Sequence, residues 1–111
     1  MKIVNKDWGK EFWIVNCDKY CGKILVLEGG YISSYHCHEI KQETFYCLKG
    51  SLVLKLKGKE MLMVAGGEPV TIFPKQFHSF RSAKGAEILE ISTEHSDDDV
   101  IRKSASHKLG E

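Results

Sequence analysis

The chain has 111 residues, with 16 Lys and Arg against 15 Asp and Glu and a formal net charge of +1 at pH 7. This length predicts a single domain over residues 1–111, and the balanced charge, without a basic stripe, argues against a nucleic-acid partner. No apolar run approaches the roughly 20 residues that span a bilayer, and the N-terminal residues lack the apolar core of a signal peptide. We therefore expect a cytoplasmic protein that has no membrane partner.

Short apolar segments alternate with turn residues along the chain, without long helical periodicity. Strands are expected at residues 12–15, 23–28, 31–38, 43–48, 51–57, 60–64, 70–73, 78–82 and 87–93. Many short strands at regular spacing are typical of an all-β sandwich or barrel. In the tail, residues 96–111, Ser96 precedes three aspartates, which leaves two alternatives: one capped helical turn or a solvated acidic loop. The expected fold is a small barrel over about residues 10–95 with a short irregular or helical tail.

Two histidines one residue apart, His36 and His38, are followed five positions later by Glu43. In a strand, side chains at i and i+2 share a face, so both imidazoles point the same way. Glu43 cannot share that face within one continuous strand, but a turn at residues 39–42 would let it open the next strand and face back. Such a carboxylate and two imidazoles make a metal site with open positions, and His78 could supply a fourth donor.

This arrangement resembles the cupin family. The first cupin motif is matched at every fixed position, by Gly30, His36, His38, Glu43 and Gly50. The second is matched by Gly67, Pro74 and His78, with one additional residue before the proline and Lys75 where the family usually has glycine. The resemblance implies a closed jelly-roll β-barrel and one divalent metal ion, which in this family is Mn, Fe, Co, Ni or Zn. By itself it implies no particular reaction.

Other stretches are similar to two groups of sugar isomerases. The Trp8-Gly9 opening and the segment from Asp97 to Arg102 resemble the cupin domain of type II phosphomannose isomerases. The spacing of Lys41 within the histidine motif resembles that of D-lyxose isomerases, in which a lysine there helps catalysis. The resemblance thus makes Lys41 a candidate catalytic group, with a solvated loop lysine as the alternative. It implies aldose–ketose isomerisation of a sugar or sugar phosphate through a cis-enediol.

Strand alternation nominates further residues around the cavity. Phe45 shares the parity of Glu43, whereas parity alone does not say whether Glu90 faces the cavity or the solvent. An inward Glu90 would be a candidate acid or base. A sugar phosphate would also need a cationic clamp, for which Lys75 and Arg81 are the nearest candidates in sequence. Neither lies in a phosphate-binding motif, so a free sugar remains open.

The other histidines and the cysteines receive no role in the predicted site. His95 and His107 have no partner at ligand spacing and are expected on the surface. The four cysteines are expected to be free, because no export signal accompanies them, and Cys47 has the parity to line the cavity. They are Cys17, Cys21, Cys37 and Cys47.

Two other functions fit the same motif. Many small cupins are oxygenases, in which a metal on these ligands binds substrate and O2, and others are barrels that bind a small molecule without catalysis. Isomerisation of a sugar by the metal-loaded protein would indicate the first function. Oxygen consumption with a thiol, diketone or catechol would indicate the oxygenase, and an inert barrel would indicate the binding protein.

We also expect a homodimer. A barrel this short has exposed strand edges near its N-terminus, and such edges invite pairing with another chain; related cupins usually dimerise there. The segment predicted to pair is residues 8–15. Light scattering at tens of micromolar should report the mass of two chains, and a monomer mass would contradict the prediction.

Overall fold

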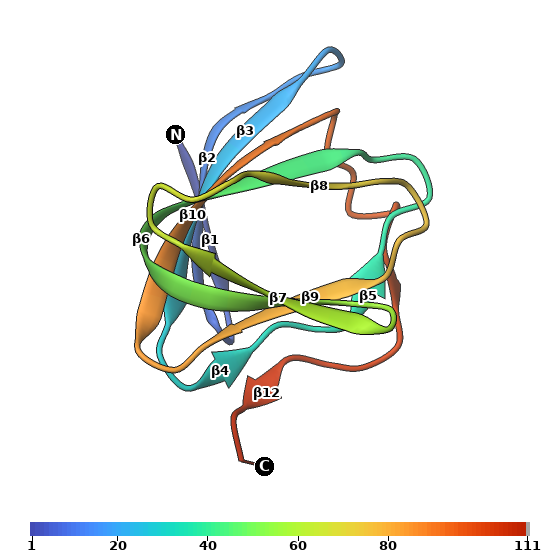
Figure 1. Ribbon diagram of the computed structural model, residues 1–111. Coiled ribbons are helices and arrows are strands. Elements are labelled where there is room, and N and C mark those ends of the chain that lie inside the picture. The colour runs from blue at the N-terminus through green and yellow to red at the C-terminus, as the bar shows by residue number, and fades with distance from the viewer. Residues whose placement is uncertain (111) are drawn as a thin grey trace.

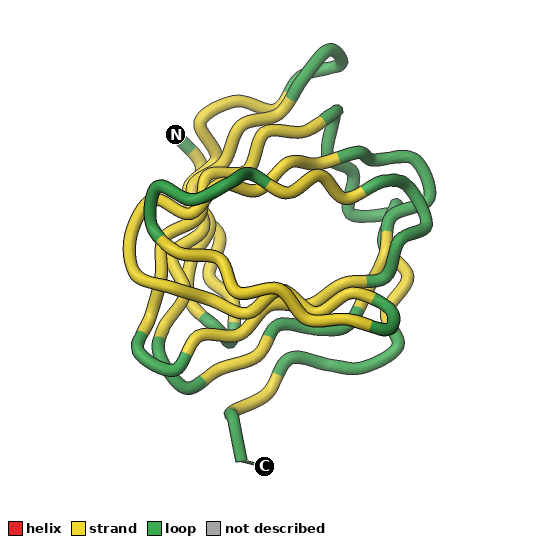
Figure 2. The backbone as a smooth tube through the Cα atoms, viewed as in Figure 1, coloured by secondary structure: helices red, strands yellow, loops and turns green. Residues whose placement is uncertain are grey.

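The computed structural model describes residues 1–110, which form strands and loops without a helix (Figures 1 and 2). The strands are β1 (Lys2–Lys6), β2 (Gly9–Asn16), β3 (Cys21–Glu28), β4 (Tyr31–Ile32), β5 (His36–Cys37), β6 (Glu43–Leu56), β7 (Lys59–Val64), β8 (Val70–Ile72), β9 (His78–Ser82), β10 (Gly85–Ser92), β11 (Ile101–Arg102) and β12 (His107–Lys108). No helix long and apolar enough to cross a membrane is found in these residues.

The long strand β6 belongs to both walls of a flattened barrel (Figure 1). Its first part pairs with β10 and β8, in the wall that continues through β3 and β2 to β1. Its second part pairs with β7 and β9, in the wall that also holds β4, β5 and the two short tail strands. Gly50 lies at the change of wall with a φ of 71°, and a Cβ there would collide with the carbonyl of Gly85. This explains why glycine is needed at this position.

The barrel interior is apolar along one part of each strand and polar along the next. On β3, Leu27 and Leu25 are buried in the core, and Lys23 is the next residue on the same face. The same change occurs from Phe45 to Glu43 on β6. It also occurs from Ile88 to Glu90 on β10 and from Phe80 to His78 on β9. The strands therefore bring their polar residues to one end of the barrel, above a packed apolar core.

Several elements differ from the sequence-based expectation. The segments 43–48 and 51–57 form one continuous strand, because Gly50 bends β6 without ending it. The segment 31–38 is divided between β4 and β5, with loop residues between them. The tail contains neither a helical turn nor a purely irregular loop: a turn closed by the Asp99 N–H and the Ser96 carbonyl leads into β11 and β12. Non-local pairing with β5 and β4 decides the tail's conformation.

The structure corrects the edge on which the dimer prediction was based. Residues 8–15 lie mainly in β2, which is paired with β1 on one side and β3 on the other. The backbone groups of residues 9–13 are therefore not open to edge pairing, and the edge strand at this end of the sheet is β1. The homodimer itself stays a prediction.

Lys75 has a φ of 68°, in the left-handed region that favours glycine. Its N–H donates a hydrogen bond of 2.6 Å to the carbonyl of His38, which joins the β8–β9 turn to the histidine loop. Because a side chain in this conformation costs about 1 kcal/mol, we expect Lys75→Gly to raise the melting temperature by a few degrees. Thermal denaturation measures the change. Lys75→Ala is the matched control, since alanine keeps the strain, and equal melting temperatures for the two variants would contradict the prediction.

Candidate functional site

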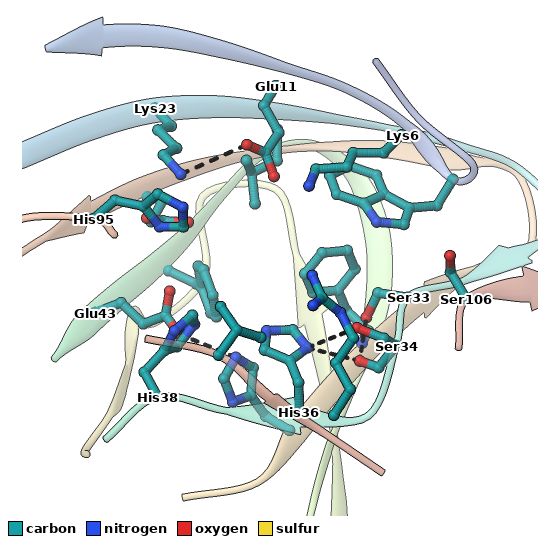
Figure 3. Close-up of a pocket in the computed structure, with 18 of the residues that line it drawn as sticks. Lys6, Glu11, Lys23, Ser33, Ser34, His36, His38, Glu43, His95 and Ser106 are labelled. Atoms are coloured by element: carbon teal, nitrogen blue, oxygen red, sulfur yellow. Dashed lines mark hydrogen bonds and ion pairs between the residues drawn. The ribbon is translucent and has the colours of Figure 1, made fainter. Parts of the chain in front are cut away.

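A cavity of about 200 Å³ opens at the polar end of the barrel (Figure 3). Its walls come from the N-terminal hairpin, from β3, β5, β6, β9 and β10, and from the C-terminal tail. The lining residues that carry chemistry are Lys6, Glu11, Lys23, His36, His38, Lys41, Glu43, His78, Glu90, His95 and Arg102. Trp8, Phe45 and Phe80 form apolar parts of the wall.

Three histidines converge in this cavity. His36 on β5 is directly opposite His78 on β9 in the antiparallel register, and His38 follows one residue after β5. One ring nitrogen from each lies within 4.8 Å of the others, a spacing at which the three could hold one metal ion. The ring centroids of His36 and His78 are 4.5 Å apart. The fold therefore brings together the three histidines that the sequence analysis singled out.

Hydrogen bonds to backbone carbonyls orient all three rings. Nδ1 of His38 lies 2.8 Å from the Asp99 carbonyl, Nδ1 of His36 2.9 Å from that of Ser34, and Nδ1 of His78 3.0 Å from that of Gln76. A carbonyl only accepts, so each Nδ1 carries a hydrogen, and each Nε2 is left to face the cavity. Metal-binding histidines are commonly oriented in this way. Burial and the neighbouring His78 lower the pKa of His36 to about 3, which keeps this ring neutral.

The Glu43 carboxylate faces two of these Nε2 atoms. Glu43 is the first residue of β6, and its Oε2 lies 3.0 Å from Nε2 of His78 and 3.4 Å from Nε2 of His38. This oxygen is buried and has no hydrogen-bond partner among residues 1–110. Burial alone would raise the pKa of Glu43, but the two histidines and Lys41 hold it well below its usual range. A buried carboxylate oxygen beside two imidazole Nε2 atoms is a donor set that suits a cation, so the residues present fit a metal ion.

Lys41 is buried between two carboxylates, so the alternative of a solvated loop lysine is wrong. Its ammonium lies 2.8 Å from Oε2 of Glu90 and 3.4 Å from Oε1 of Glu43. Burial by itself would lower the pKa of Lys41, but Glu90 and Glu43 outweigh it and raise the pKa above its ordinary value. The lysine therefore stays a cation whose charge is balanced inside the cavity.

The structure shows which residues of β10 face the interior of the barrel. Ile88, Glu90 and Ser92 are buried, whereas Ile91 is exposed. Glu90 therefore lies inside the cavity, where its carboxylate contacts Lys41 and accepts a hydrogen bond of 3.3 Å from the Ser92 hydroxyl. Its position opposite Phe45 in the β10–β6 register places it beside the strand that carries Glu43.

His95 was expected on the surface, and this expectation is wrong. Nδ1 of its ring accepts a hydrogen bond of 3.1 Å from the Lys41 ammonium, while Nε2 donates one of 2.9 Å to the Asp97 carboxylate. Trp13 packs edge-on against the ring, and the Asn16 side chain bonds both backbone groups of His95. Burial, followed by the charges of Lys41 and Lys23, lowers the pKa of His95 to about 4. No sequence spacing indicated this contact, because the partners lie 54 residues apart.

A second buried lysine was also missed. Lys23 is 1% exposed, lies 3.5 Å from Oε1 of Glu11 and stacks over the Trp13 ring at 4.0 Å from its centroid. The indole N–H of Trp13 donates a 2.8 Å hydrogen bond to the same Glu11 oxygen. The inward alternation of β3 was the available signal, since Lys23 has the parity of Leu25 and Leu27.

The two cations proposed from the sequence as a phosphate clamp do not line the cavity. Lys75 is exposed on the β8–β9 turn, and Arg81 forms an external bidentate pair with Glu60 at 2.8 and 3.1 Å. Phe45 does line the cavity. Of the four free cysteines, Cys47 packs in the apolar core and does not line the site, and His107 is exposed as expected.

Comparison with known proteins agrees with this geometry. No protein-family model matches the chain. A D-lyxose/D-mannose isomerase from Thermosediminibacter oceani is 30% identical over 77% of this chain and 61% of its own length. The chain thus spans about three fifths of that relative.

Solved structures share the architecture at low sequence identity. A cupin-2 domain-containing protein from Shewanella frigidimarina is 23% identical with a TM-score of 0.66, covering 79% of this chain and 82% of its own. KdgF from Halomonas sp. is 12% identical with a TM-score of 0.78, covering 88% and 92%. The chain is therefore a small cupin-fold protein with three histidines that could bind a metal ion.

Proposed function

We propose that His36, His38, Glu43 and His78 together bind one divalent metal ion. The observation that carries the proposal is the buried Glu43 oxygen, which has no hydrogen-bond partner among residues 1–110 and faces the Nε2 atoms of two histidines. Imidazole and carboxylate ligands suit Mn, Fe, Co, Ni and Zn alike, so the identity of the ion has to come from elemental analysis.

We expect His38→Ala to abolish metal loading and to leave the barrel folded, because the apolar core lies below the site. Elemental analysis of purified protein, followed by titration with Mn, Fe(II), Co, Ni and Zn, measures the loading. Circular dichroism reports the fold. His107→Ala removes an exposed histidine and is the matched control. An unmodified protein that contains no metal and binds none would contradict the proposal.

We propose that the protein is a metal-dependent aldose–ketose isomerase that acts on a sugar or sugar derivative. The juxtaposition of a carboxylate, Glu90, and an ammonium, Lys41, beside the candidate metal site is the observation that carries this proposal. Isomerisation moves a proton between C1 and C2 through a cis-enediol, and it needs such an acid–base group within reach. The 30% identical relative, a D-lyxose/D-mannose isomerase, supports the same reaction class.

The two residues would have different roles. The Glu90 carboxylate would take the proton from C2 of the aldose and return it to C1, while the proton of the O2 hydroxyl passes to O1, which gives the ketose. The Lys41 ammonium forms ion pairs with Glu90 and Glu43 and thereby fixes both carboxylates relative to each other. A divalent ion at the histidines would polarise the two sugar oxygens and stabilise negative charge on them.

The surrounding residues support this assignment. Phe45 and Phe80 provide an apolar floor below the buried carboxylate. His95 accepts a hydrogen bond from the Lys41 ammonium, which leaves no proton of that group without a neighbouring acceptor. The base is thus held in place before substrate arrives, which limits reorganisation during proton transfer.

Solvent exchange tests the reaction before the sugar is known. The metal-loaded protein should transfer deuterium from D2O into C2 of an aldose or C1 of a ketose, because the enediol must regain a proton there. Glu90→Gln should slow turnover by about 10²- to 10⁴-fold, the usual contribution of a positioned base, without loss of metal. Glu87→Gln, on the same strand but paired with Lys49 at the surface, is the control and should keep its activity.

The exchange experiment also separates the alternatives. If no pentose, hexose or hexose derivative exchanges with Mn, Fe(II), Co, Ni or Zn bound, the isomerase proposal is wrong. Oxygen consumption would then identify an oxygenase, and inert metal-loaded protein would identify a binding barrel.

A further inference from the structure

The mouth of the cavity carries two cations that the proposed reaction does not use. Lys6, the last residue of β1, and Arg102, on β11, both line the cavity. Among residues 1–110 neither side chain forms an ion pair, although the other two lysines of the cavity do. These two cations are therefore the ones that are open to a ligand.

The two cations come from opposite ends of the chain, and the fold brings those ends together. Asp7, next to Lys6, accepts a 3.1 Å hydrogen bond from the hydroxyl of Ser106 in the tail. Arg102 is paired in register with His36, so its strand runs directly along the histidine strand. Figure 3 shows Lys6 across the cavity from His36 and Ser34. The mouth is thus bounded by Lys6 on one side and by the tail strand with Arg102 on the other.

The charges inside the cavity determine whether it favours an anionic or a cationic ligand. Four cationic side chains line it, and the three acidic ones, Glu11, Glu43 and Glu90, each lie within ion-pair distance of a buried lysine. The lining thus has one excess positive charge before any metal is counted, and a divalent ion at the histidines would make the excess larger. Such a cavity attracts an anion and disfavours a cation.

The position of the unpaired cations also fits an anion at one end of the ligand. Lys6 and Arg102 are exposed, so an anion there keeps part of its hydration and avoids the cost of full burial. The candidate metal site and Glu90 lie deeper, where neutral hydroxyl and carbonyl groups would fit. A ligand with a neutral reactive end and an anionic far end satisfies both regions.

We infer that Lys6 and Arg102 form a subsite for an anionic group, so that the substrate is an acidic sugar, carrying a phosphate or a carboxylate at the end remote from the reacting carbons. This inference rests on the proposed function for the identity of the reacting end. It replaces the clamp of Lys75 and Arg81 with two residues that lie at the cavity.

Binding of unreactive sugar alcohols tests the subsite without turnover. Calorimetry on the metal-loaded protein would compare neutral D-mannitol with D-mannitol 1-phosphate and with D-mannonate, which carry a phosphate or a carboxylate at one end. At least one anionic ligand should bind about tenfold to a hundredfold more tightly than mannitol, the range expected for charge-assisted hydrogen bonds. The phosphate and carboxylate arms show which anion the subsite prefers, and added salt should reduce the preference.

Variants separate the subsite from direct binding of the anion to the metal. Lys6→Ala and Arg102→Ala should each weaken the anionic ligand by about tenfold and leave the affinity for mannitol unchanged, whereas Lys6→Arg and Arg102→Lys should keep most of the preference. Lys10→Ala and Lys103→Ala remove nearby cations that do not line the cavity and are the controls. Circular dichroism checks that each variant folds.

Three results would overturn the inference: equal affinity for anionic and neutral ligands, a preference that survives both alanine variants, or no binding of any of the three ligands at millimolar concentration. Deuterium exchange distinguishes failure of the inference from failure of the proposed reaction. Charge preference without exchange in any sugar contradicts only the isomerase, whereas exchange without charge preference contradicts only the subsite.

Discussion

The candidate site depends on the different contacts that the two oxygens of the Glu43 carboxylate make. One oxygen lies against the Lys41 ammonium, and the other faces the Nε2 atoms of His78 and His38. Each of these rings has its hydrogen on Nδ1, because a backbone carbonyl requires it there. A carboxylate oxygen and two imidazole nitrogens thus meet in a buried space, an arrangement that suits a cation. The backbone carbonyls of Gln76, in the β8–β9 turn, and of Asp99, in the tail, thereby orient these two rings.

The barrel can hold these buried charges because the inward-facing residues of these strands change from apolar to charged at the same level of the barrel. Leu25, Phe45 and Ile88 pack in the core, and the next inward positions on their strands are Lys23, Glu43 and Glu90. A buried charge without a partner would destabilise the fold by several kcal/mol. Here Lys23 pairs with Glu11 on the neighbouring strand β2, and Lys41, just before β6, lies between Glu90 and Glu43, so each charge has a partner of opposite sign. The apolar residues below the site hold the strands in register while the polar residues above remain available to a ligand.

The sequence predicted those features that follow from short-range spacing. A strand period of two and one turn indicated how His36, His38 and Glu43 face, whereas the second motif with His78, and the choice of a barrel over a sandwich, came from the resemblance to cupins. The contacts that were missed join distant segments. The tail strands form by pairing with β4 and β5, and His95 meets Lys41 across 54 residues. Parity left Glu90 undecided, since only the packing of β10 between β3 and β6 selects its inward face.

The tail, one of these distant segments, contacts both the histidine strand and the mouth of the cavity. Its strand β11 adds to β5, so it supports the histidine strand and at the same time places Arg102 at the mouth. Asp99 strengthens this link, because its carbonyl accepts from His38 and its carboxylate accepts from the N–H groups of residues 39–41. The segment that orients a candidate metal ligand is therefore continuous with the segment that bounds the entrance. A change in the tail would therefore alter the orientation of His38 and the position of Arg102 together. Selection of the ligand at the mouth is in this way coupled to the candidate metal site.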